Sequence, residues 1–359
     1  MRNAEYWAER ALNEMLMGER SVLEYENALL DAYRVSLREI KKDIDSFFTR
    51  YAIQNKVTYQ EARRRLVSSE MKEFQAMVRQ WLKYAQDNGW ERVYIQYLES
   101  LLSAKYISRL EMLEADIRYQ IELIENHKKD NLKALMENNY LAAYYVRFHD
   151  LAVGAEMSIR FDTIDAQTLA RVVAQKWDDG NYSSRIWNDR ARLIRAMQTI
   201  LPQSFSRGLN SVKLGDMIAK EMNTSQNRGR TLARTEINYI CNQADLAVYK
   251  AAGVETYEYL ATLDIRTSEI CRGMDGTIHK VSQAQVGINY PPLHPNCRST
   301  TVPHYEDLQV LERVAKDEDG KNIRVSRKTS QEDWIKTYVP EEDQERLLSF
   351  TKKFYKSEK

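Results

Sequence analysis

Apolar residues in the first part of the chain recur at alternating steps of three and four positions. One such series comprises Leu30, Tyr33, Leu37, Ile40, Ile44 and Phe47. This spacing places the side chains on one face of an α-helix. The stripe fits either a coiled-coil seam or a helix packing on its neighbours, and its length of under about four heptads favours the second.

The positions of proline indicate where long helices can form. The first proline is Pro202, and because proline breaks helix interiors, the long stretch before it favours long helices. Turn-forming residues interrupt the pattern at 55–58 and 87–89. A long helical pattern then runs over about 90–145. Shorter helices are expected over 165–177 and 184–200.

The pattern changes after residue 204. Helices are expected at about 212–222 and 226–252, and the second ends at a glycine, as helices often do. Residues 254–262 are rich in β-branched and aromatic side chains and predict a strand. Asp275-Gly276 predicts a turn, and a hairpin around it.

These elements predict a mostly α protein with a small α+β C-terminal module. An elongated helical N-terminal region is followed by a compact module that contains cysteine and histidine. The expected domains are residues 1–203, 204–306 and 307–359, the last a charged tail in which Trp334, Ile335 and Tyr338 could dock a short helix.

Composition narrows the class of protein. With 43% hydrophobic and 29% charged residues, the chain is expected to fold, and a net charge of +1 argues against a wholly basic nucleic-acid binder. No run of about 18 apolar residues exists, so no membrane span is expected. The first residues do not resemble a secretory signal, and three cysteines favour a reduced, cytoplasmic protein.

One short stretch concentrates the candidate chemistry. Its inner set is Cys271, His279, His294 and Cys297. Thiolate and imidazole are the ligands that zinc prefers, and four of them close a tetrahedron. The two-residue gap between His294 and Cys297 lets one turn present both side chains, while Cys271 and His279 flank the expected turn. A structural zinc ion is therefore the favoured interpretation.

Three other interpretations of this set stay open. Cys271 and Cys297 could form a disulfide. They could be buried small apolar residues, with the histidines hydrogen-bonded to the backbone. A cysteine–histidine nucleophile pair is the third, although no orienting group is identifiable. Cys241 lies on the apolar face of an expected helix and is interpreted as core packing.

The stretch from about residue 231 to 305 contains several short motifs. The first is Ala-Arg-Thr-Glu at 233–236, followed by Asn242, Ala244 and Gly253. The second comprises residues 262–268 and leads to Cys271 and Gly276. The last is Pro-Pro-Leu-His-Pro-Asn-Cys-Arg-Ser-Thr at 291–300. In order and spacing this stretch resembles the module of the phage Mu F-like head-morphogenesis proteins. Some relatives carry a second cysteine after Cys-Arg, where this chain has Ser299.

The resemblance implies a minor capsid protein of a tailed bacteriophage. Such proteins act in the virion head, assemble in the host cytoplasm, and associate with the portal vertex. The implied partners are the portal protein, the major capsid or scaffolding protein, and double-stranded DNA. No enzymatic activity is expected.

Two further hypotheses rest on charged residues. Short basic runs at 63–65 and 228–230 could contact DNA phosphates, although a solvated helix face is their commoner meaning. A metal-dependent hydrolase would use Glu236 or Asp264 as acid or base beside the metal. The favoured alternative is a structural role, in which these carboxylates pair with nearby arginines and fix the helix against the hairpin. The charged set is Arg234, Glu236, Asp264, Arg266 and Arg272.

Overall fold

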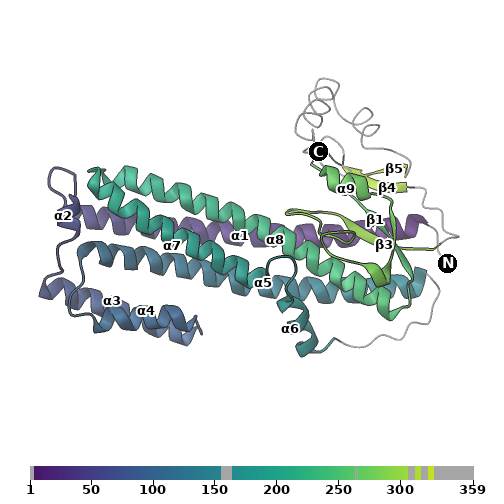
Figure 1. Ribbon diagram of the computed structural model, residues 1–359, viewed down its shortest axis with the longest axis horizontal. Coiled ribbons are helices and arrows are strands. Elements are labelled where there is room, and N and C mark those ends of the chain that lie inside the picture. Colours follow the sequence, from purple (N-terminus) through teal and green to yellow (C-terminus); the bar gives the residue numbers. More distant parts are fainter. Residues whose placement is uncertain are drawn as a thin grey trace, which may run out of the picture. The chain divides into compact units, whose positions relative to one another are not determined.

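The chain is mainly helical. The computed structural model describes residues 4–154, 164–262, 264, 266–305, 312–316 and 322–326. Within these ranges it has nine α-helices, one short 3-10 helix and five short strands (Figure 1). The predicted class, mostly α with a small α+β C-terminal module, is confirmed.

Three of the helices exceed forty residues. The helices are α1 (Ala4–Tyr51), α2 (Tyr59–Ala62), α3 (Ser68–Asp87), α4 (Arg92–Ser103), α5 (Arg109–Gly154), α6 (Ala166–Ala174), α7 (Tyr182–Ser206), α8 (Ser211–Ala251) and α9 (Glu269–Met274). The pattern predicted over 90–145 is divided into α4 and α5. The predicted break between 222 and 226 is wrong, because α8 continues through it.

Side-chain hydrogen bonds explain why α8 is continuous here. Thr224 hydrogen-bonds the carbonyl of Lys220, and the hydroxyl of Ser225 donates to Asp189 at 2.6 Å. Both polar side chains are thus satisfied inside the helix. Gly229 lies inside the same helix, and a Cβ at this position would lie only 3.1 Å from Leu29 Cδ2. Close approach of a neighbouring side chain explains this glycine.

The chain forms two compact units that interleave along the sequence. One comprises residues 1–25, 132–181 and 231–359, and the other 26–131 and 182–230. Helices α1, α5 and α8 therefore contribute residues to both units. The predicted domains follow one another instead, and their boundaries at 203 and 306 remain predictions.

In the unit formed by 26–131 and 182–230, the predicted stripe of α1 faces the interior. Tyr33, Ile40, Ile44 and Phe47 are all buried. Phe47 packs against Phe205 of α7 with ring centroids 5.5 Å apart. This burial is what the period of 3.6 residues predicts for a helix that packs on its neighbours.

The same unit buries a group of charged and polar side chains. Lys128 is 1% exposed, and its Nζ lies 2.7 Å from Glu125 Oε2 and 3.2 Å from Asp189 Oδ2. Tyr33 and Ser225 share a hydrogen bond of 2.6 Å beside this group. A buried cation is tolerated here because carboxylates and hydroxyls surround it.

The other unit contains a three-stranded antiparallel sheet in the order β2-β1-β3. Its strands are β1 (Thr256–Leu260), β2 (Ile278–Lys280) and β3 (Thr300–His304). The predicted strand is β1, and Gly276, with φ of +73°, makes the predicted turn before β2. A 3-10 helix, η1 (Val281–Gln283), follows β2.

Part of the predicted tail is also described. Strand β4 (Glu312–Lys316) pairs antiparallel with β5 (Asn322–Ser326). Trp334, Ile335 and Tyr338, proposed above to dock a helix, lie outside the described residues.

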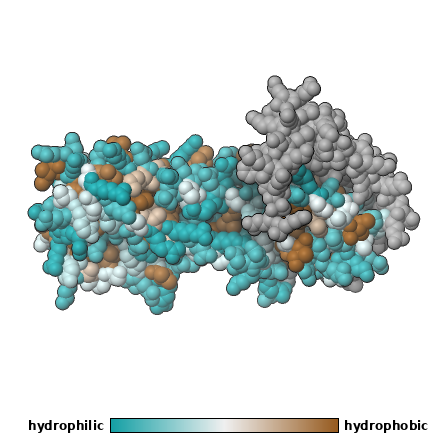
Figure 2. Space-filling model, turned by 45° about the horizontal axis from the view of Figure 1, so that its top comes forward, coloured by the Kyte–Doolittle hydropathy of each residue, from teal (hydrophilic) through white to brown (hydrophobic). Residues whose placement is uncertain are grey.

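Hydrophilic residues cover most of the face seen in Figure 2, and apolar residues form scattered patches. None of the helices in the described ranges is long and apolar enough to cross a bilayer.

Two acidic side chains interact in the unit formed by 26–131 and 182–230. Burial and the charge of Asp43 raise the pKa of Asp116 well above its usual value, and Asp116 Oδ1 is buried without a hydrogen-bond partner among the described residues. Burial and the charge of Glu39 raise the pKa of Asp43 to about 6. Folding therefore makes protonation of each carboxyl group more favourable than it is in the unfolded chain.

We expect Asp116→Asn to stabilise the protein at neutral pH. A carboxyl with a raised folded-state pKa contributes stability below its unfolded pKa, near about 4, and loses it as pH rises through the folded value. The amide removes this loss, so the melting temperature should increase at about pH 7.5 and change little at about pH 4. Thermal unfolding at both pH values, with Asp130→Asn as an exposed control, measures this. An equal change at both pH values would contradict it.

Candidate metal centre

Helix α9 positions the first cysteine. The hydroxyl of Ser268 accepts a hydrogen bond of 3.3 Å from the backbone N–H of Cys271, which caps the helix at its first turn. Cys271 is buried with Tyr259, Ala261 and Cys297 in one apolar cluster. The cap therefore directs this thiol into the interior of the module.

A tight turn positions the second pair. The backbone N–H of Cys297 donates to the carbonyl of His294 at 3.1 Å. Asn296 adopts a φ of +59°, a left-handed conformation that asparagine tolerates better than most residues. The His-Pro-Asn-Cys sequence thus presents His294 and Cys297 from one turn, as its spacing predicts.

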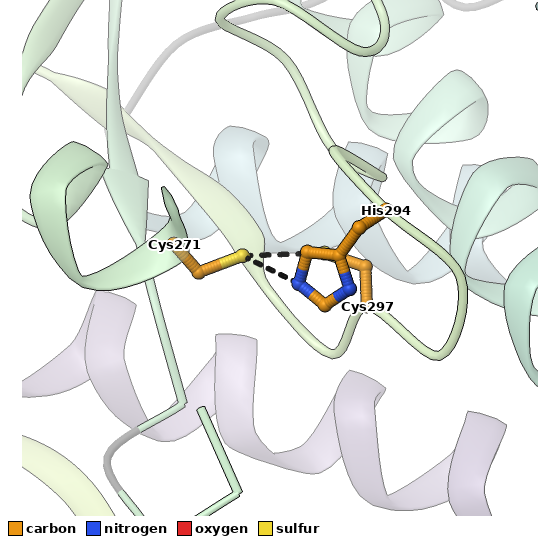
Figure 3. A group of neighbouring side chains, drawn as sticks. All are labelled: Cys271, His294 and Cys297. Atoms are coloured by element: carbon orange, nitrogen blue, oxygen red, sulfur yellow. Dashed lines mark hydrogen bonds between the residues drawn. The ribbon is translucent and has the colours of Figure 1, made fainter. Parts of the chain in front are cut away.

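The structure brings Cys271, His294 and Cys297 together. The two Sγ atoms are 3.7 Å apart, and Cys271 Sγ lies 3.1 Å from His294 Nε2 (Figure 3). In Figure 3, Cys271 points from α9 towards the two residues of the turn. All three ligand atoms lie within 4.8 Å of one another.

These distances fit a metal better than a disulfide. Thiolates about 2.3 Å from a tetrahedral zinc ion lie about 3.8 Å apart, close to the observed separation of the sulfurs. A disulfide would need about 2.05 Å, and both cysteines are free thiols. The three side chains could therefore hold a metal ion.

The structure does not bring His279 to this group. Its Nε2 is 2.8 Å from the hydroxyl of Thr277, and its ring lies 5.6 Å from that of Tyr257. The antiparallel register pairs His279 with Tyr257, two residues along β1 from Tyr259, a shift of about 7 Å. Cys241 lies elsewhere, half-buried on α8.

Tyr259 is a member of the site that sequence reasoning missed. Its hydroxyl lies 3.3 Å from Cys271 Sγ and 4.0 Å from Cys297 Sγ. Burial, together with the two neighbouring cysteines, raises its pKa, so the phenol keeps its proton. A strand tyrosine carries no sequence signal for this role, because only the folding of α9 and the turn over β1 creates it.

Hydrogen bonds set the protonation of the two thiols. The bond from Cys297 lowers the pKa of Cys271, and the bonds from His294 and Ser268 add to this against the effect of burial. The same bond to Cys271, with burial, raises the pKa of Cys297, and the bond to Cys271 raises that of His294. A metal ion that bound both sulfurs would have to displace the proton of Cys297.

Helix α8 holds the turn by a series of side-chain hydrogen bonds to its backbone. Thr235 Oγ1 accepts from the N–H of Asn296 at 3.0 Å, and Asn238 Nδ2 donates to the carbonyl of Ser299 at 2.9 Å. Further along α8, Asn242 Nδ2 donates to the carbonyl of Ser299 at 3.4 Å. The hydroxyl of Tyr249 donates to the carbonyl of Thr301 at 3.1 Å. The spacings of three, four and seven place these four side chains on one face of α8.

The carboxylates considered for catalysis are engaged in structural contacts. Asp264 is buried and accepts hydrogen bonds from both terminal nitrogens of Arg298. Burial opposes its ionisation, but these bonds outweigh burial and lower its pKa. Glu236, 1% exposed, accepts a bond of 3.1 Å from Trp177 Nε1. Arg298 and Trp177 were not predicted as partners.

Comparison with known proteins agrees with the predicted resemblance. Residues 195–302 match the family described as Phage Mu protein F like protein. The matched segment runs from within α7 to β3 and includes Cys271, His279, His294 and Cys297. It covers under a third of the chain. The resemblance is therefore confirmed for this segment. Searches of curated proteins and of solved structures found no match.

We expect His294→Ala to weaken binding of Co²⁺ and His279→Ala to leave it unchanged. Residues that merely support a ligand change metal affinity by about 10–100-fold, so loss of a direct ligand should cost at least about tenfold. Titration of the thiolate-to-cobalt charge-transfer band measures both affinities. Equal loss in the two variants would contradict the three-residue group.

Proposed function

We propose that this chain is a minor capsid protein acting in head morphogenesis of a tailed bacteriophage, bound at the portal vertex or capsid interior. The observation that carries the proposal is the match of residues 195–302 to the phage Mu F-like family. The buried Cys/His group and the contacts of α8 with its turn fall inside that segment. We further propose that the portal protein, with the major capsid or scaffolding protein, is its partner.

Within this function, we propose that Cys271, His294 and Cys297 hold a structural zinc ion. Thiolates and imidazoles are ligands that zinc prefers, and the group supplies three of the four that a closed structural site has. The sheet module is small, and a structural zinc ion supplies stability on the order of 10 kcal/mol in such modules. The buried hydroxyl of Tyr259 lies beside both sulfurs and would hydrogen-bond a metal-bound thiolate.

We propose no enzymatic activity. The carboxylates that a hydrolase would use support the fold instead: Glu236 accepts from Trp177, and Asp264 binds Arg298. Neither belongs to the group that could hold a metal among the described residues.

The alternative of a DNA-binding head protein receives less support. Arg64 pairs with Glu61 at 3.0 Å, and Arg230 pairs with Glu26 at 3.1 Å. Arg228 Nε forms an ion pair with Asp189 Oδ1. The guanidinium of Arg65 lies over the ring of Tyr106, 4.0 Å from its centroid. These arginines make contacts within the protein that explain their presence.

We expect native mass spectrometry to find one zinc ion per chain. Cys297→Ser should lose the ion, because serine is a much poorer zinc ligand, and should expose the segment around 256–304 to proteolysis. Cys241→Ser, outside the group, should retain both zinc and protease resistance. Wild-type protein that is folded without metal would remove the zinc proposal and leave the family assignment intact.

We expect the protein to be present in purified phage heads at a lower copy number than the major capsid protein. Quantitative mass spectrometry of intact heads measures this ratio. A phage from which the gene is deleted should form fewer heads of normal size, and expression of the wild-type protein from a plasmid should restore them. Absence from heads, together with normal heads in the deletion phage, would overturn the proposed function.

A further inference from the structure

A pocket of about 740 Å³ lies beside the candidate metal centre, within the unit formed by residues 1–25, 132–181 and 231–359. Its walls are residues 16–23 of α1, residues 234–242 of α8 and the segment 294–300, with Arg266 and Ser268 at its edge. We call it the arginine pocket. Its volume lies in the range of about 300–1,000 Å³ that ligand sites usually have.

More basic than acidic side chains line this pocket. Four arginines line it, namely Arg20, Arg234, Arg266 and Arg298, against one acidic residue, Glu19. Arg298 is held by Asp264 and is therefore fixed in position. Arg266, whose side chain is 68% exposed, also lies 3.7 Å from Asp264. Planar guanidinium groups bind carboxylates in bidentate geometry, so the pocket favours an anionic ligand.

The same pocket has an apolar side. Leu16, Val22, Leu23 and Ile237 line it. Leu23 is 57% exposed and Ile237 is buried. A Cβ at Gly18 would lie 3.6 Å from Ile237 Cγ2, an ordinary van der Waals distance, so α1 and α8 are in contact here. Apolar side chains next to arginines suit a ligand that carries both apolar and acidic groups.

The lining argues against nucleic acid as the ligand. Among the described residues that line the pocket, none is aromatic, and sequence-tolerant binding of single strands depends on aromatic stacking. The apolar side of the pocket would be left without a partner. A peptide with acidic and apolar side chains at helical spacing fills both sides of the pocket.

We propose that the arginine pocket binds an acidic, amphipathic segment of a partner protein. Carboxylates of that segment pair with Arg20 and Arg266, and its apolar side chains cover Leu23 and Ile237. The identity of the partner as another head protein rests on the proposed function. The chemistry of the segment rests only on the pocket.

The test uses the full-length protein and overlapping synthetic peptides that cover the structural proteins encoded by the same phage. We expect the bound peptides to carry net negative charge and an apolar face. Arg20→Glu should weaken the affinity for these peptides about tenfold or more, and Arg20→Gln should weaken it less. Leu23→Ser should also weaken this affinity. Arg38→Glu, an exposed arginine of α1 outside the pocket, should leave binding unchanged. Circular dichroism checks that each variant folds.

Three results would overturn this proposal. The first is that no peptide binds, and the second is that the bound peptides show no excess of acidic residues. The third is that Arg20→Glu and Arg38→Glu affect binding equally. A duplex DNA probe whose binding is lost in Arg20→Glu, but not in Arg38→Glu, would likewise replace the peptide with nucleic acid. Presence of the protein in phage heads is measured separately, so failure here and failure of the proposed function are distinguishable.

Discussion

The C-terminal module depends on the hydrogen bonds by which α8 grips the backbone of its closing turn. Four side chains on one face of α8 bind the N–H of Asn296 and the carbonyl oxygens of Ser299 and Thr301. They belong to Thr235, Asn238, Asn242 and Tyr249. Ser299 and Thr301 are buried, so their carbonyl groups would otherwise lack partners away from water, at considerable cost. One helix face therefore fixes the path of the chain that carries His294 and Cys297, and α9 only needs to bring Cys271 opposite.

Charged groups inside each unit follow a comparable logic. Arg147 and Asp245, 0% and 1% exposed, form a bidentate pair between α5 and α8 in the unit that holds the sheet. Lys128 is enclosed by Glu125 and Asp189 in the other unit. Breaking a buried pair leaves a charge without compensation, so these contacts specify how neighbouring helices pack more than they add to stability. Long amphipathic helices would otherwise slide with little penalty.

Sequence reasoning succeeded where one periodicity or one residue type was sufficient. The stripe through Tyr33 and Phe47 lies in the core because its period is helical, and the His-Pro-Asn-Cys spacing does form one turn. The break expected before 226 failed because Ser225 finds partners that are distant in sequence. His279 lies apart from the other three candidate ligands because the register of β2 on β1 decides its place. Tyr259 and Arg298 were missed for the same reason, since tertiary contacts alone create their roles.

The candidate metal centre and the arginine pocket share one segment of chain. His294 and Cys297 line the pocket as well as the group that could hold a metal. Arg298 follows directly and reaches the pocket while it binds Asp264. A metal ion that fixed the two ligands would also fix this wall, so a ligand in the pocket would not have to order it on binding. Pre-organisation of the binding wall would give such an ion a functional consequence without any catalysis.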